Sequence, residues 1–144
     1  MLKALSLLGL LMMGGGVVAL WKLGALFSPS PAVIAVQALA VALFLWARWT
    51  FGVRSFHAAA NPTEGGLVTT GPYRFIRHPI YTAICLFGWA GVAAHASAVN
   101  ALLGALMTAG AIVRMLCEEK LVVETYPEYR EYAKRTKRMI PGVF

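Results

Sequence analysis

The residues best suited to chemistry lie in two short clusters. The first is Gly71-Pro72-Tyr73-Arg74-Phe75-Ile76-Arg77-His78-Pro79-Ile80-Tyr81, which leads directly into a long apolar run. The second is Arg114 with Glu118 and Glu119, at four- and five-residue spacing on one helix. Ionisable groups at the edge of a membrane cost free energy unless they are paired or functional. The pattern indicates a cofactor pocket at a membrane surface, with an aromatic wall facing a charged wall.

A purely structural interpretation of the same residues stays open. Arg74 and Arg77 are typical of charges that anchor a helix end at the headgroup level, and Tyr81 is typical of an interfacial ring. Arg114 and Glu118 are four residues apart, a spacing at which two side chains form a simple ion pair on a helix. On residue types alone, structure and function explain the two clusters equally well.

The composition favours a membrane environment. Of 144 residues, 59% are hydrophobic and 13% charged, and the mean hydropathy is +0.68. A soluble domain this small buries only about two-thirds of its surface on folding, so it could not hide that much apolar area. The net charge of +7 comes from basic residues that flank apolar runs, which favours topology signals over nucleic-acid binding. We expect one integral-membrane domain, residues 1–144, with no nucleic-acid partner.

Several common kinds of site are absent from the sequence. Cys85 and Cys117 lie in apolar runs, without a CxxC pattern or a paired His, so no disulfide framework or metal site is expected. There is no glycine-rich dinucleotide fingerprint, no Walker loop and no Gly-x-Ser-x-Gly motif. If the chain is an enzyme, its active site therefore lies in or on the membrane.

The apolar segments predict an all-α protein with about four transmembrane helices. The first two spans are expected at about residues 3–27 and 32–53, separated by Ser28-Pro29-Ser30-Pro31, where the prolines cannot continue a helix. We interpret the first as a retained span and not as a cleaved signal, because its apolar run is long and no cleavage site precedes Trp21.

The next apolar stretch, residues 79–113, contains no Asp, Glu, Lys or Arg. As one helix it would be about 52 Å long, against a hydrocarbon core of about 30 Å. We therefore expect a helical hairpin that turns at His95-Ala96-Ser97, with arms at about 79–95 and 98–117. Small residues suit close helix packing, within one chain or between chains; they are Gly14, Gly15 and Gly16 in the first span, Gly88, Gly91 and Ala94 on one arm, and Ala101, Ala105 and Ala109 on the other.

The two polar segments are expected to meet at one membrane face. Residues 54–78 form a cofactor loop, and residues 118–144 form a tail with a basic amphipathic helix at 128–137 after an N-cap at Thr125. With four spans, both termini share the side that holds all 13 Lys and Arg residues except Lys22. By the positive-inside rule, the termini and the cofactor site lie on the cytoplasmic face of the cell or inner membrane.

Together with their flanks, the two clusters resemble a known family. The shared elements, in chain order, are Gly71-Pro72-Tyr73, Arg77-His78-Pro79-Ile80-Tyr81, a hydrophobic hairpin, Glu118-Glu119, Glu128-Tyr129-x-x-Tyr132 and Ile140-Pro141. The chain is similar to the isoprenylcysteine carboxyl methyltransferases, and to the related phospholipid methyltransferases, over about residues 64–143. Ala83 stands where the family usually has Gly, and Tyr126-Pro127 replaces the usual Phe-Gly.

The resemblance implies an integral-membrane methyltransferase that uses S-adenosyl-L-methionine and releases S-adenosyl-L-homocysteine. Carried over by motif, the cofactor-binding residues are Gly65, Gly66, Leu67, Val68, Tyr73, His78, Pro79, Ile80, Tyr81 and Glu119. The catalytic residues are Arg114, which would face the acceptor, and Glu118, which is also an alternative to Glu119 for the polar end of the cofactor. The implied partners are membrane lipids and a lipidic or prenylated acceptor.

The acceptor separates the remaining hypotheses. An isoprenylcysteine carboxylate needs no general base, whereas the amine of phosphatidylethanolamine needs one, for which Glu118, Glu119 and His57 are candidates. A sterol-reductase-like enzyme that uses NADPH has a similar hairpin region, and a membrane scaffold without activity is the non-enzymatic alternative. The resemblance favours the carboxyl O-methyltransferase.

Overall fold

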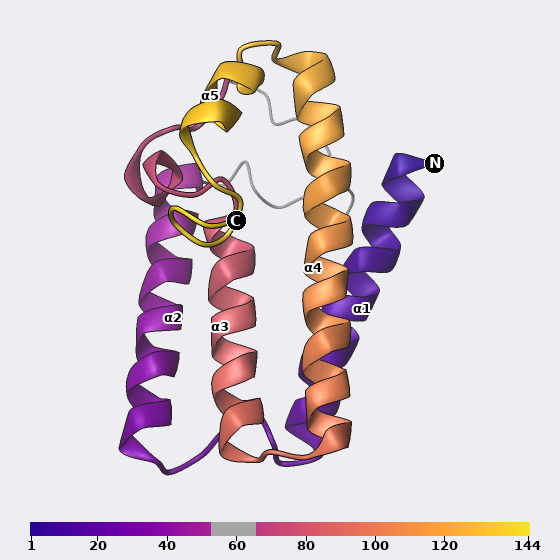
Figure 1. The fold of residues 1–144 in the computed structure, drawn as a ribbon, viewed down its shortest axis with the longest axis vertical. Helices are drawn as coiled ribbons and strands as arrows, with labels where there is room; N and C mark the ends of the chain where they lie inside the picture. Colours follow the sequence, from indigo (N-terminus) through magenta and orange to yellow (C-terminus); the bar gives the residue numbers. More distant parts are fainter. Residues whose placement is uncertain (53–65) are drawn as a thin grey trace.

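Four long helices make up most of the protein. The computed structural model describes residues 1–52 and 66–144, and the helices are α1 (Leu2–Lys22), α2 (Pro31–Phe51), α3 (Pro79–Ala94) and α4 (Ala98–Thr125). Figure 1 shows them side by side in the order α2, α3, α4, α1, with α1 tilted against α4. The short 3-10 helix η2 (Gly71–Arg74) and the helix α5 (Tyr129–Arg135) lie at one end of the four.

The helices have the length and surface of membrane spans. Of the helices in the described residues, α1, α2 and α4 are long and apolar enough to cross a membrane, and α3 is a shorter apolar helix of 16 residues. Large apolar side chains point outward along them, among them Leu11, Leu39 and Leu102, which are 71%, 67% and 71% exposed. Such a surface suits lipid and not water. The prediction of an all-α integral-membrane protein is confirmed.

The hairpin turns where the sequence predicts. The helix α3 ends at Ala94 and α4 begins at Ala98. Ser97 caps α4, because its side chain accepts a hydrogen bond from the backbone N–H of Asn100, and the Asn100 amide in turn donates to His95 O at 2.6 Å. These bonds satisfy backbone groups that a tight turn leaves without helical partners.

The C-terminal part differs from the expectation in two details. The helix α4 continues to Thr125, whose hydroxyl donates to Leu121 O, so Thr125 ends α4 and the predicted N-cap there is wrong. The helix α5 spans only Tyr129–Arg135, because the backbone becomes extended at Thr136. The following residues run alongside the segment before α3, where Ile76 and Lys137 form an isolated parallel bridge.

Close helix contact occurs between α1 and α4 at Gly9 and Gly110, which the sequence did not single out, and at Gly16, which it did; Gly88 and Gly91 of α3 are also closely packed, as expected. A Cβ atom at Gly110 would lie 2.5 Å from Met13 N and 2.6 Å from Gly9 O, so only glycine permits this approach. Of the three consecutive glycines in α1, only Gly16 has a neighbour within 4 Å of an added Cβ atom.

The alanines suggested for close packing on α4 do not pack within the chain. Ala101, Ala105 and Ala109 are exposed. The buried stripe of α4 consists of Asn100, Gly104, Met107, Gly110, Ala111, Arg114, Met115 and Cys117. This stripe faces inward because α4 packs against α1 as well as against its hairpin partner α3, where Gly88 lies against Met107.

Gly110→Ala should destabilise the protein, because the added methyl group meets backbone atoms of α1 that cannot rotate away. Overpacking of this kind costs about 1–3 kcal/mol in free energy of unfolding. The measurement is thermal unfolding in detergent. The matched control is Gly15→Ala, where an added Cβ has nothing within 4 Å; equal melting temperatures for the two variants would contradict the α1–α4 packing.

Candidate functional site

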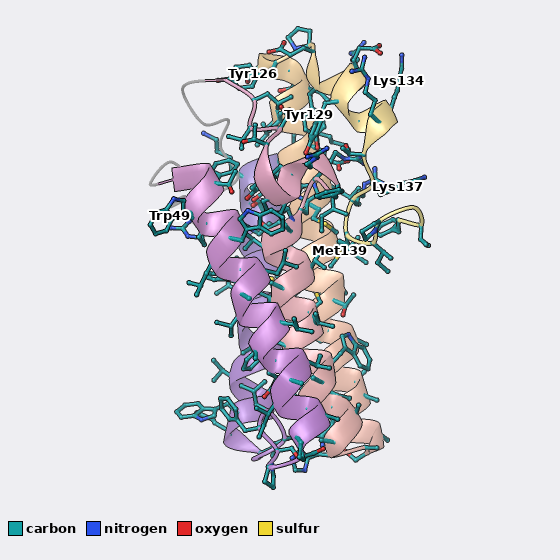
Figure 2. The ribbon with its side chains drawn as sticks, turned by 90° about the vertical axis from the view of Figure 1, so that its left-hand side faces the viewer. Trp49, Tyr126, Tyr129, Lys134, Lys137 and Met139 are labelled. Carbon is teal, nitrogen blue, oxygen red and sulfur yellow. The ribbon has the colours of Figure 1, made fainter. Side chains whose placement is uncertain are left out.

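A cavity of about 350 Å³ lies at the end of the bundle that carries η2 and α5. Small-molecule sites have volumes of about 300–1,000 Å³, so the cavity can hold a cofactor-sized ligand. Residues from all four long helices, from the segment before α3 and from α5 line it. Figure 2 shows Tyr126 and Tyr129, two of these residues, near this end of the bundle.

The structure brings the two sequence clusters together around this cavity. Of the expected site residues, those that line it are Gly66, Leu67, Val68, Tyr73, His78, Pro79, Ile80, Tyr81, Arg114, Glu118 and Glu119. Gly65, and the candidate base His57, lie outside the described residues. The roles expected for these side chains stay predictions, whereas their convergence on one cavity is an observed property of the fold.

Tyr73 reaches the cavity because of the tight turn before it. Gly71 has φ of 57°, which favours glycine, and an added Cβ would lie 2.5 Å from the Thr50 hydroxyl oxygen. The 3-10 turn that follows therefore packs against the end of α2, and the Tyr73 ring lies 5.4 Å from the Phe51 ring. Tyr132 donates its hydroxyl to Tyr73 O at 2.5 Å, which holds the turn from the α5 side.

The start of α3 places His78 and Tyr81 on one wall. His78 precedes the first helical residue, Pro79, a position where proline is well tolerated because no helical N–H is needed there. Residues three apart on a helix lie on the same face, and the His78 and Tyr81 rings are 5.7 Å apart. The His78 carbonyl is held by the Thr82 backbone N–H and hydroxyl. Rigid backbone therefore orients both rings toward the cavity.

Glu118 belongs to a triad of polar side chains. Its Oε1 accepts the Tyr81 hydroxyl at 2.6 Å and lies 3.2 Å from Arg114 Nε, the expected i,i+4 ion pair. Arg114 Nε also donates to the Tyr81 hydroxyl oxygen at 2.6 Å. Glu118 Oε2 lies 4.0 Å from His78 Nδ1, too far for a direct hydrogen bond. One oxygen of Glu118 is thus held by the protein, while its other oxygen is less engaged.

Glu119 is held more completely. Its Oε1 accepts from Arg77 Nε at 2.9 Å and lies 3.1 Å from His78 Nε2. Its Oε2 accepts from Arg138 Nε and Nη2, at 3.1 and 3.0 Å. A carboxylate has about four acceptor positions, so these donors occupy them. The side chain is 13% exposed, against 25% for Glu118, which makes Glu118 the more accessible of the two carboxylates.

Arg77 connects this carboxylate to the C-terminal part of the chain. Beyond its bond to Glu119, its Nη1 donates to Ala133 O at 2.9 Å and to Thr136 O. Its side chain is only 8% exposed. A guanidinium has five N–H donors in a fixed geometry, which suits one side chain that binds a carboxylate and two carbonyls at once.

Sequence reasoning missed half of the cavity lining. The additional residues are Leu10, Met13, Phe44, Arg48, Phe51, Arg77, Ile84, Val122, Tyr126, Tyr129 and Tyr132. Arg77 was considered only as part of the motif, and Arg48, an ionisable residue in an apolar helix, was a detectable signal. Tyr129 and Tyr132 belong to the Glu128-Tyr129-x-x-Tyr132 element of the resemblance, so the sequence did carry a signal for them. The aliphatic and phenylalanine members carry none, because they are the residue types that every membrane helix contains.

Burial keeps the tyrosines at the polar end in the neutral form. Removal from water raises the pKa of Tyr132 to about 12, and burial also raises the pKa of Tyr73 and Tyr129. Neutral phenols can donate hydrogen bonds, as Tyr132 does to Tyr73 O. These rings therefore offer hydrogen bonds and flat apolar faces, but no charge, to a ligand in the cavity.

The family model for phospholipid methyltransferases matches residues 31–129. The chain belongs to the phospholipid methyltransferase family. The matched range includes α2, which the resemblance seen in the sequence left out, and it contains every expected site residue. Family membership thus agrees with a methyltransferase-like domain in the membrane.

Two curated relatives share part of this sequence. They are the cobalt-zinc-cadmium resistance protein CzcN of Cupriavidus metallidurans and the nickel-cobalt-cadmium resistance protein NccN of Alcaligenes xylosoxydans xylosoxydans. Each is 41% identical over 81 residues, which is 52% of this chain and 35% or 36% of the relative. The chain thus matches these relatives over about a third of their length.

Arg77→Ala should strongly destabilise the site, because it removes one cationic partner of Glu119 and the hydrogen-bond donor to the Ala133 and Thr136 carbonyls. Breaking a buried ion pair by removing one partner costs about 3–5 kcal/mol. Arg74→Ala is the control, since Arg74 is exposed and lies against the Phe75 ring; it should change stability by less than about 0.5 kcal/mol. Thermal unfolding in detergent measures both, and equal losses would contradict the network.

Proposed function

We propose that this protein is an S-adenosylmethionine-dependent membrane methyltransferase whose acceptor is a lipid-linked anion, most like an isoprenylcysteine carboxyl O-methyltransferase. The observation that carries the proposal is the convergence of the His78–Tyr81 wall and the Arg114–Glu118 pair on one cavity. Membership of the phospholipid methyltransferase family supports the reaction class, since methyltransferases of this family use S-adenosylmethionine.

The chemistry of the lining fits this cofactor. Tyr73, Pro79 and Ile80 provide aromatic and apolar surface for an adenine ring, and hydroxyl and imidazole groups for a ribose lie beside them. Glu118, with its less engaged Oε2, is the carboxylate we assign to the ammonium group at the amino-acid end. Glu119, whose oxygens are occupied by Arg77, His78 and Arg138, then supports the pocket by holding His78. The cofactor, when bound, supplies an electrophilic methyl group on a positively charged sulfur.

The charges of the cavity favour an anionic acceptor. Three arginines and two glutamates line it, and Arg114 is 6% exposed. A guanidinium with several donors binds a carboxylate well. Methylation of a carboxylate needs no proton transfer. An amine acceptor needs a general base; Glu119 is fully paired, and Glu118 is the carboxylate that we assign to the cofactor.

The apolar lining supports a lipidic acceptor. Leu10 and Met13 of α1, Phe44 of α2 and Ile84 of α3 add apolar side chains to the lining of the cavity. The helix α2 packs on α3, and α1 packs chiefly on α4. Both α1 and α2 line the cavity, so its apolar lining comes from both sides of the bundle. A hydrocarbon chain that enters from the membrane would lie against these side chains and present its polar end to Arg114.

The second candidate is a phospholipid N-methyltransferase, which the description of the matched family favours.

The names of the two relatives associate them with resistance to metals. Within residues 1–52 and 66–144, no group of three His, Cys or Glu side chains is placed to hold a metal ion.

Methyl transfer from methyl-labelled S-adenosylmethionine tests the function and the acceptor together. We expect label to enter a prenylated cysteine with a free carboxylate, and to be released by alkali, because methyl esters hydrolyse. The methyl-ester form of the same acceptor should take up no label. Label in phosphatidylethanolamine that withstands alkali would favour the N-methyltransferase instead.

Arg114→Gln should lower kcat/KM for the carboxylate acceptor by about 100-fold, since it removes a charge-assisted contact in a dry site. Binding of S-adenosylhomocysteine should weaken by less than kcat/KM falls, because Arg114 affects the cofactor only through its ion pair with Glu118. Arg130→Gln, on an exposed residue of α5, is the matched control. Equal activities of the Arg114 variant and the control would contradict this role.

A further inference from the structure

The C-terminal segment is joined to the site motif through backbone bonds. Arg77 N–H donates to Lys137 O at 2.7 Å, and His78 N–H donates to Arg138 O at 2.9 Å. One turn into α3, the Thr82 hydroxyl donates to Met139 O at 3.0 Å. These bonds use only main-chain acceptors of the C-terminal segment, so they set its position whatever side chains it carries.

This pairing gives neighbouring side chains opposite directions. Successive side chains of an extended segment point to opposite sides. Accordingly, Lys137 is exposed, whereas Thr136 is buried and the Arg138 guanidinium turns toward α4. The Phe144 ring lies 5.5 Å from that guanidinium, so an aromatic face covers part of it.

Arg138 acts on one defined oxygen of Glu119. Its Nε and Nη2 both donate to Oε2, while Arg77 and His78 contact Oε1. The last torsion of a Glu side chain is broad, so a carboxylate held at one oxygen can still rotate. Donors on both oxygens stop that rotation. The carboxylate then presents Oε1 to His78 in one orientation.

We propose that Arg138 is a positioning residue of the active site, which orients Glu119 and through it the His78 ring at the cavity wall. Arg138 does not line the cavity and lies beyond the family match, which ends at residue 129. The C-terminal segment of this chain therefore completes the cofactor site. This inference rests on the proposed function, because its effect is on the binding of S-adenosylhomocysteine.

The test is a double-mutant cycle of Arg138→Gln and Glu119→Gln, read by isothermal titration with S-adenosylhomocysteine below the melting temperature of each variant. Arg138→Gln should weaken binding about tenfold, as expected for the loss of a charge-assisted hydrogen bond. In the Glu119→Gln background the same change should weaken binding by less than about twofold, because the coupled partner is already altered.

Two further variants separate positioning from general damage. Lys137→Gln removes the same charge from the adjacent, exposed residue and should leave the affinity unchanged. Arg138→Lys keeps the charge and a donor, so it should recover part of the affinity; it replaces Arg138→Gln in the cycle if that variant does not fold.

The outcomes are distinct. Wild-type affinity in the Arg138 variants, equal losses for Arg138→Gln and Lys137→Gln, or additive losses in the cycle would overturn the positioning role and leave the proposed function standing. A wild-type protein that does not bind S-adenosylhomocysteine would overturn both.

Discussion

The site depends on the satisfaction of one nearly buried carboxylate, Glu119. An ionised carboxylate away from water is stable only if charged and hydrogen-bonding partners surround it. Here the carboxylate and its partners come from three separate parts of the chain: Glu119 from α4, Arg77 and His78 from the segment that starts α3, and Arg138 from the C-terminal segment. The requirement to pair this charge therefore brings together the parts that form the cavity wall.

A second constraint acts on the other side of the cavity. Glycines bring α1 and α4 into backbone contact, and an added Cβ at Gly9 would lie 3.1 Å from Arg114 N. The position of Arg114 along the helix bundle is thereby fixed by α1, while its side chain is held by Glu118 and Tyr81. The two adjacent glutamates therefore differ: Glu119 joins three segments of the chain, and Glu118 is the more exposed of the two.

Much of this arrangement was predictable where the signal is local. The charge-free run of residues 79–113 was too long for one span and placed the turn at His95–Ser97, and the His78-Pro79 and Glu118-Glu119 patterns identified two walls of the cavity. The packing face of α4 was not predictable, because Gly and Ala occur on several of its faces and only the position of α1 decides which is buried. Arg138 could not be assigned either, since its contact depends on main-chain pairing between segments 60 residues apart, as in the bond from His78 N–H to Arg138 O.

The most direct test of the account is isothermal titration of the purified wild-type chain in detergent with S-adenosylhomocysteine, with NADPH titrated in parallel. We expect saturable binding of S-adenosylhomocysteine at a stoichiometry of about one per chain, in the micromolar range typical of enzyme–cofactor complexes, and no binding of NADPH. Binding of NADPH without S-adenosylhomocysteine would contradict the methyltransferase assignment and favour a reductase. Binding of neither would make the Glu119 network a structural feature of a membrane scaffold.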